Sequence, residues 1–243
     1  MMKGYVWVLL IAMTSMECVA GLDEGAKAFR AKDYQTAFKE FSPLATNGHA
    51  VAQFLLGAMY DHGEGVPQDY SQAADWYRKA ADQGDVDAQF NLGNMYRKGK
   101  GVPQDYSQAA DWYRKAADQG DVDAQYALGF MYYNGEGVPQ NYSQAAVLYR
   151  KAGTQGHSNA LNNLGVFYEF GRLGAQNLVL AHIFYNLAAV NGNETNKANR
   201  DQVTQQLTSA QLSEAQKIAS QWVKGQPLPT ITKTYPSSSK KEK

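Results

Sequence analysis

The sequence predicts an all-α protein: a right-handed superhelical α/α solenoid of about five 36-residue helix-turn-helix repeats with a C-terminal capping helix. The first observation is a stretch of 25 residues, GVPQDYSQAADWYRKAADQGDVDAQ, that occurs at 65–89 and again at 101–125. The second is that alanine, tyrosine and glycine positions recur every 36 residues through most of the chain. The third is an apolar spacing of three and four residues inside each repeat, which is typical of one helix face. Helix pairs of this kind bury little alone, so they form a core by stacking on their neighbours.

The first helix of a repeat is clearest in the second copy. Ala73 and Tyr77 lie on one face of this helix. Either Asp69 or Ser71 can cap its start, because their side-chain oxygens accept hydrogen bonds from the free backbone N–H groups. Gly84 ends the helix, since glycine tolerates the left-handed conformation that a helix end often needs.

The second helix of the same repeat places Ala88, Leu92 and Tyr96 on one face. A glycine-rich loop and Pro103 then stop it, because proline cannot continue a helix. Gly93 lies inside this helix, where glycine costs about 1 kcal/mol relative to alanine. Its recurrence predicts a close approach of another helix, for which we expect the alanine surface at 73–74 or 80–81.

The recurrence divides the chain into consecutive segments. A signal peptide is predicted at 1–20 and an N-terminal capping helix at 21–33. C-terminal capping helices are predicted at 193–225, and a tail rich in proline, serine and lysine at 226–243 has a disordered composition. Between them the solenoid covers 34–192. Its repeats are predicted at 34–69, 70–105, 106–141, 142–177 and, in degenerate form, 178–192.

The N-terminal residues have the pattern of an export signal. Lys3 precedes a short apolar stretch, and small residues around Ala20 suit cleavage after that residue. A retained N-terminal anchor and a lipoprotein signal that uses Cys18 are the alternatives. Cleavage after Ala20 would leave no cysteine and no membrane span, so we expect a periplasmic or secreted protein without disulfides.

Two departures from the pattern lie near the ends. Pro43 stands in the column of Lys79, and proline inside a helix predicts a break near Ser42. The first helix of the fifth repeat is apolar on nearly all sides, so it needs a cover. The segments 194–206 and 209–224 are the expected cover, and Thr208 with Gln211 forms a possible capping box at the start of the second.

The repeat resembles a known family. The pattern A-x-x-W/Y-Y-x-x-A-A-x-x-G followed by A-x-x-x-L-G-x-x-Y-x-x-G-x-G-V-P-Q is similar to that of the Sel1-like repeats, a branch of the tetratricopeptide-like solenoids. The resemblance implies an adaptor that holds other proteins or peptides, and exported bacterial members are often tied to envelope maintenance or host contact. Some relatives carry a cysteine pair in each repeat and are associated with penicillin binding, but this chain lacks those cysteines.

The composition disfavours several function classes. Lys+Arg and Asp+Glu are both 23, and a nucleic-acid binder usually has a basic excess. Neither H-E-x-x-H nor G-x-S-x-G occurs, and the histidines and the cysteine do not have metal-ligand spacing. We therefore expect a monomeric, non-catalytic protein with no cofactor and no metal.

Candidate partner-binding residues lie on the outer columns of the helices. Tryptophan and arginine are typical anchors of protein interfaces. An alternative for the tryptophans is that they pack against the adjacent repeat. Exposed aromatic residues are also expected where the ends of the second helices vary. The candidates are Trp76, Arg78, Lys79, Trp112, Arg114, Lys115, Tyr133, Leu148 and Phe170.

Three hypotheses for the function follow. The first is an exported scaffold that binds a protein or peptide partner and has no catalytic activity. The second, by analogy with the family alone, is a cell-wall-active or penicillin-binding enzyme. The third is an architectural spacer in the periplasm.

Overall fold

The computed structural model describes residues 20–190 and 194–231, and within these ranges it contains helices and turns but no strand. The all-α prediction is therefore confirmed. Two compact units divide the chain, Met1–Ala116 and Ala117–Lys243, and are called unit 1 and unit 2 below. Residues 1–19 of the predicted signal peptide, which include Cys18, and the last 12 residues of the predicted tail lie outside the described residues.

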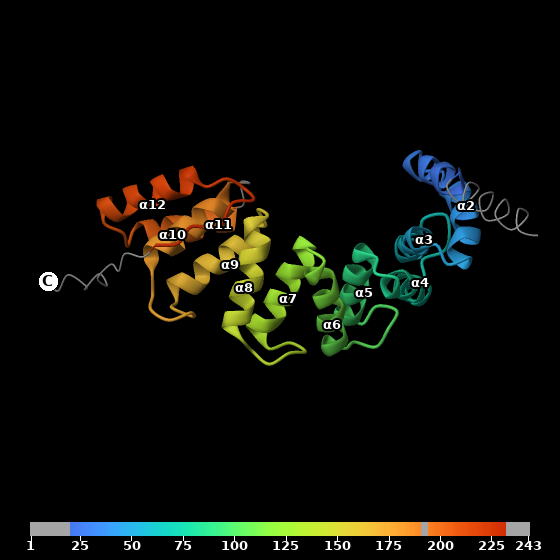
Figure 1. Ribbon diagram of the computed structural model, residues 1–243, viewed down its shortest axis with the longest axis horizontal. Helices are drawn as coiled ribbons and strands as arrows, with labels where there is room; N and C mark the ends of the chain where they lie inside the picture. The colour runs from blue at the N-terminus through green and yellow to red at the C-terminus, as the bar shows by residue number, and fades with distance from the viewer. Residues whose placement is uncertain (1–19, 191–193, 232–243) are drawn as a thin grey trace, which may run out of the picture. The chain divides into compact units, whose positions relative to one another are not determined.

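Unit 1 begins with helical residues 20–30 and continues as helix pairs (Figure 1). Its helices are α2 (Tyr34–Thr46), α3 (Ala50–His62), α4 (Tyr70–Asp82), α5 (Val86–Lys98) and α6 (Tyr106–Asp118), the last of which runs to the boundary with unit 2. The first helices of successive repeats start at Tyr34, Tyr70 and Tyr106, so the structure reproduces the 36-residue period of the sequence.

The loops between repeats are closed by side chains of the repeated motif. Asp69 accepts hydrogen bonds from the backbone N–H groups of Ser71 and Gln72, so the predicted cap of α4 is confirmed. The glutamine of each V-P-Q turn donates to a carbonyl at the end of the preceding helix. Gln104, for example, donates to the Arg97 carbonyl over 2.9 Å. The motif thus satisfies helix-end carbonyls that would otherwise lack a partner.

The glycine inside each second helix faces a tyrosine of the next repeat. A Cβ atom on Gly93 would lie 2.7 Å from the Tyr113 ring and 3.4 Å from the Ala109 carbonyl oxygen. The predicted close approach is therefore confirmed. The prediction that Gly93 faces the alanine surface of its own repeat is wrong, because it faces the next repeat. Tyr113 is fully buried and donates from its hydroxyl to Asn94 over 2.9 Å, which fixes the ring over the glycine.

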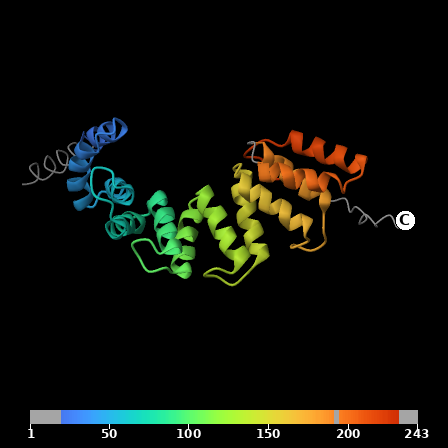
Figure 2. The same cartoon turned by 180° about the vertical axis from the view of Figure 1, so that it is seen from behind.

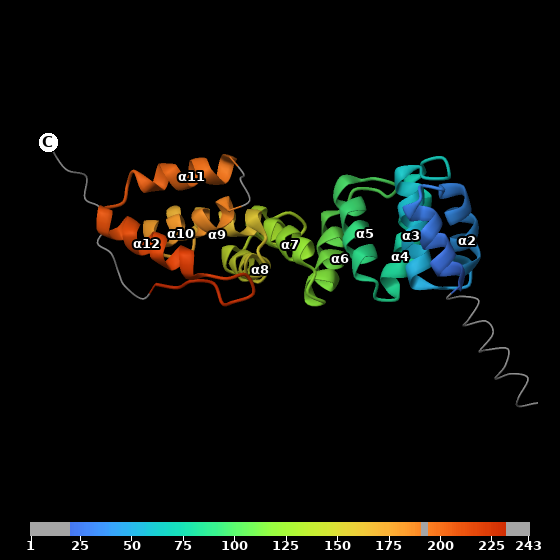
Figure 3. The same cartoon turned by 90° about the horizontal axis from the view of Figure 1, so that it is seen from above.

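Unit 2 contains the remaining helix pairs and the cap; Figure 2 shows them from behind, in colours from yellow-green to red. Its helices are α7 (Val122–Asn134), α8 (Tyr142–Thr154), α9 (Ser158–Glu169), α10 (Leu178–Ala189), α11 (Glu194–Thr204) and α12 (Ser209–Gln221). As predicted, α10 is buried on nearly all sides, and both α11 and α12 pack against it (Figure 3). The capping box of Thr208 and Gln211 is also present at the start of α12.

Two expectations about the ends are wrong. Helix α2 continues through Pro43 without a break, because the loss of one N–H group leaves the next turns intact: Thr46 Oγ1 and the Asn47 N–H still donate to the carbonyls of Ser42 and Pro43. The chain also does not leave the fold at residue 226. Leu228 is buried in the main core cluster of unit 2, so residues 226–231 belong to the packed structure.

Candidate partner-binding site

The outer faces of α4 and α6 in unit 1 carry the same side chains twice. On α4, Lys79 Nζ stands 3.7 Å from the centre of the Trp76 ring. On α6, Lys115 Nζ stands 3.6 Å from the centre of the Trp112 ring. Both lysines are exposed, and each ammonium group is held over an aromatic face by a cation–π contact. We call this surface the α4/α6 ridge.

Ion pairs repeat along the same ridge. Arg78 lies 3.1 Å from Asp75, and Arg114 lies 2.6 Å from Asp111. Arg78 also donates to the Tyr96 hydroxyl over 3.0 Å, which ties α4 to α5. The aspartate side chains remain 59% and 61% exposed, so each copy presents one carboxylate and one ammonium group to solvent.

Two of the predicted binding residues are not available to a partner. Trp112 is only 7% exposed and belongs to a core cluster with Leu92 and Met95 of the preceding helix. Leu148 is 8% exposed, because it lies on α8 where Gly129 of α7 approaches it. Trp76 is half-buried against Leu56 in the same manner. The tryptophans therefore pack against the adjacent repeat, as the alternative interpretation predicted.

The other two aromatic candidates belong to unit 2. Tyr133 is half-buried and stacks on Phe167 with ring centres 5.6 Å apart. It also contacts Tyr142 at 5.6 Å, so it is an interior ring and not the exposed one that its position predicted. Phe170 is 63% exposed, as expected. The predicted residues thus do not form one site: Trp76, Arg78, Lys79, Trp112, Arg114 and Lys115 share the α4/α6 ridge, and the rest lie in unit 2.

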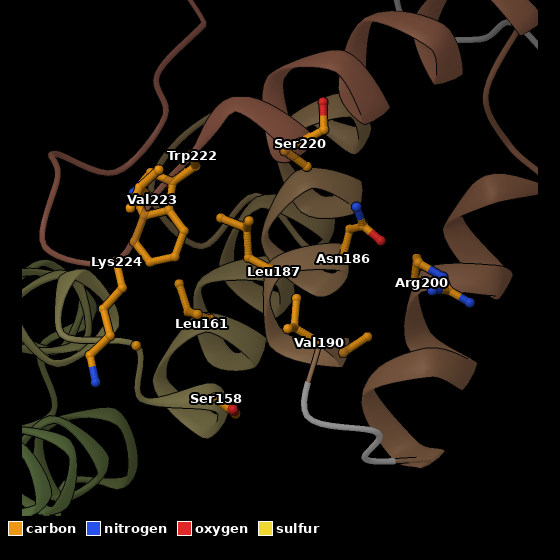
Figure 4. A pocket seen from close by; sticks show the side chains of 13 residues that line it. Ser158, Leu161, Asn186, Leu187, Val190, Arg200, Ser220, Trp222, Val223 and Lys224 are labelled. Atoms are coloured by element: carbon orange, nitrogen blue, oxygen red, sulfur yellow. The ribbon is translucent and has the colours of Figure 1, made fainter.

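A cleft in unit 2 is absent from the sequence prediction. Its volume is about 660 Å³. Its walls come from the start of α9, the end of α10, α11, the end of α12 and the segment after α12 (Figure 4). These segments are far apart in the sequence, so no local motif could indicate the cleft. The one available signal was the replacement of Lys79, Lys115 and Lys151 by Leu187 in the same column.

Comparison with known proteins decides the family. The Sel1 repeat profile matches residues 50–85, 86–121, 122–157 and 158–193, which is more than half of the chain. The chain belongs to the Sel1 repeat family. Sel1 repeats generally serve as protein-interaction scaffolds. No curated protein matches the sequence.

Solved structures of other Sel1 repeat proteins resemble this one. A protective antigen present in uropathogenic Escherichia coli strains, which displays an SLR fold, is 37% identical with a TM-score of 0.75. That match covers 79% of this chain but only 42% of the antigen, so the chain spans less than half of its length. A Sel1 repeat protein from Oxalobacter formigenes is 33% identical with a TM-score of 0.70, and the match covers 82% of this chain and 83% of that one.

Burial shifts the pKa of several titratable groups of this Sel1 repeat protein. Burial lowers the pKa of His157, and the nearby carboxylate of Asp123 opposes the effect. Burial also lowers the pKa of His182 and raises the pKa of Tyr185, whose hydroxyl donates to Glu169 over 2.6 Å. Within residues 20–190 and 194–231, no group of three His, Cys, Asp or Glu side chains is arranged to hold a metal ion. Nor is any helix in those ranges long and apolar enough to cross a membrane.

Proposed function

We propose that this Sel1 repeat protein is an exported, non-catalytic scaffold that holds a protein or peptide partner against the α4/α6 ridge. The observation that carries the proposal is that α4 and α6 present the same exposed groups in the same arrangement. Each copy offers the amide of Gln72 or Gln108 together with a carboxylate and an ammonium group. Because the same three groups occur twice, one repeat apart, an extended polypeptide could bind both copies at once.

The ridge has the physical properties of a recognition surface. The ammonium groups of Lys79 and Lys115 are restrained by the tryptophan rings below them, so less side-chain freedom is lost when a partner binds. The tryptophans themselves are fixed by packing on the preceding repeat. A buried framework therefore holds an exposed set of hydrogen-bonding and charged groups, which favours specificity over nonspecific apolar adhesion.

Export is supported by two further observations. The first 20 residues have the pattern of a signal peptide. The similar Escherichia coli protein is a protective antigen, and a protein that protects as an antigen is one that the host encounters. A role in envelope maintenance or host contact fits both. The alternative of a cell-wall-active or penicillin-binding enzyme gains no support from the structure or from the relatives.

Site-specific crosslinking in cells tests the proposal. A photo-crosslinking amino acid is placed at Gln72 or Gln108 on the ridge, and at Lys98 on α5 as a control. We expect the same partner to be captured from both ridge positions and not from Lys98. The double variant Lys79→Glu/Lys115→Glu should weaken binding of that partner more than either single change. Capture from Lys98 alone, or undiminished binding by the double variant, would contradict the ridge as the site.

A further inference from the structure

The geometry of unit 2 points to a second binding site: we propose that its cleft binds the carboxyl-terminal end of a peptide whose last residues are apolar. The floor of the cleft is apolar. It includes Leu161 of α9, Leu187 of α10 and the ring of Trp222 after α12. Val190 and Val223 stand at its edge and are 79% and 60% exposed, so apolar surface stays in contact with water where it could instead contact a ligand.

The cleft exists because the side chains of α12 are small where this helix covers α10. Helix α12 contributes only Ala219 and Ser220 to the lining, opposite Leu187 of α10. The Trp222 ring forms a fixed wall, since its Nε1 donates to the Gln226 carbonyl over 3.2 Å. The following backbone is anchored as well, because the Gly225 N–H donates to the Thr154 carbonyl over 2.8 Å. The cleft is therefore a built feature of the cap.

The charged residues around the cleft favour a ligand with an anionic terminal group. None of the described residues that line it is acidic. Arg200 lies on one side but is paired with Asp201 at 2.8 Å. Lys224 lies on the other side, and it has no ion pair among the described residues (Figure 4). Its aliphatic part lies over Gly156, where a Cβ atom would stand 3.1 Å from its Cδ, and this contact places the side chain beside the start of α9.

Helix α9 adds to this positive end. It begins at Ser158, which lines the cleft, and the N-terminus of a helix carries a partial positive charge. A carboxylate would thus bind beside Lys224, and apolar side chains would extend across Leu161 and Leu187. A volume of about 660 Å³ is in the range of ligand sites and fits two or three residues.

A peptide fits the lining better than an acyl chain that ends in a carboxylate. Asn186 lines the cleft, and its side-chain amide has no hydrogen-bond partner among the described residues. An amide at this place can bind a peptide N–H or carbonyl group, whereas an acyl chain has none to offer.

Fluorescence polarisation with the full chain tests the proposal. The probe is a fluorescein-labelled peptide GSGLLV with a free carboxyl terminus, and the same peptide with an amidated terminus is its control. We expect the free acid to bind about tenfold more tightly than the amide. Lys224→Gln should abolish this preference, and Ser220→Phe, an exposed position, should fill the cleft and prevent binding. Lys217→Gln on the exposed face of α12 should change nothing.

Three results with the peptide probes would overturn the proposal. They are equal binding of the acid and the amide, loss of the preference in Lys217→Gln as well as in Lys224→Gln, and no binding by a chain whose circular dichroism shows it folded. Tighter binding of dodecanoate than of the peptide would assign the cleft to an acyl chain and would also overturn it. The variant Lys79→Glu/Lys115→Glu should bind the peptide normally, so the cleft and the α4/α6 ridge can fail independently.

Discussion

Helices α4 and α10 occupy the same place in the repeat, but they present opposite outer surfaces. Toward the preceding repeat the two helices are alike, because Tyr77 packs on Gly57 and Tyr185 packs on Gly165. A Cβ atom added to either glycine would lie only 2.8 Å from the Tyr77 ring or 2.6 Å from the Tyr185 ring. On the outer side, Asp75 of α4 is exposed, whereas Ile183 in the same column of α10 is fully buried.

The difference shows that two separate constraints act on one helix. Stacking on the preceding repeat fixes the tyrosine and the alanines beside it, because each tyrosine ring fills the space left by a glycine. The outer face depends on what covers it. Solvent covers α4, and α11 with α12 cover α10. The outer face of α4 is therefore free to recognise a partner, while that of α10 closes the core beside the cleft.

The largest expected effect comes from exchanging these outer residues. Ile183→Asp would bury an unpaired carboxylate and should lower the free energy of unfolding by at least about 3 kcal/mol. Asp75→Ile removes only an exposed ion pair with Arg78 and should change it by less than about 0.5 kcal/mol. Urea denaturation followed by circular dichroism measures both. Similar losses in the two variants would show that the two outer faces do not differ as described.

The next effect tests what the two helices share. Gly93→Ala would place a Cβ atom 2.7 Å from the Tyr113 ring, and overpacking of this kind costs about 1–3 kcal/mol. The better helix propensity of alanine would offset part of that cost. In a Tyr113→Leu background the same substitution should cost less, because the smaller side chain can move away. Thermal unfolding of the four proteins in this cycle gives the coupling energy, and a value near zero would rule out the close contact.

Much of this architecture could be predicted because each repeat carries its own signals. The caps, the helix-ending glycines and the apolar columns act locally, so Asp69 and the capping box of Thr208 were recognised from the sequence. Contacts between neighbouring repeats were harder to predict. The partner of Gly93 lies in the next repeat, and burial of Trp112 depends on that same contact between repeats.

The candidate sites show the same limit. The sequence groups the side chains of the α4/α6 ridge by their columns, but it does not show that the tryptophans form the packed base of the ridge and the lysines its exposed part. The cleft was missed because Leu161, Leu187 and Trp222 come from segments with different periodicity. These residues come together only when α11 and α12 pack on α10, and their spacing along the chain does not predict that packing.

A smaller effect concerns the C-terminal cap of unit 2, which α11 and α12 form. Thr208→Ala removes the acceptor for the Gln211 N–H and should cost about 1 kcal/mol. Because α12 covers α10, we expect faster amide hydrogen exchange in α12 and then in α10, with α4 unaffected. Ser209→Ala, one residue inside the helix, is the matched control and should leave the exchange unchanged. Equal acceleration in α4 would mean that the capping box does not act on the cap alone.

The smallest effect is a pH dependence that distinguishes α9 of unit 2 from α5 of unit 1. Asp85 caps α5 through its carboxylate, whereas His157 caps α9 by accepting the Ala160 N–H at its Nδ1. Protonation at Nδ1 would destroy that bond. Burial lowers the pKa of His157 in the folded protein, although its Nε2 faces Asp123 at 3.4 Å.

The direction of this dependence follows from linkage. Above about pH 6.5, the usual pKa of histidine, both states are neutral and the cap is intact. Below that pH the unfolded chain takes up the proton first, so the free energy of unfolding should fall as the pH decreases, by less than about 1 kcal/mol in total. His157→Asn keeps a cap of the kind that Asn141 and Asn177 already provide for α8 and α10. Urea denaturation between pH 5 and 8 should therefore show a weaker slope in this variant, and an unchanged slope would assign the pH dependence to other groups, His182 first.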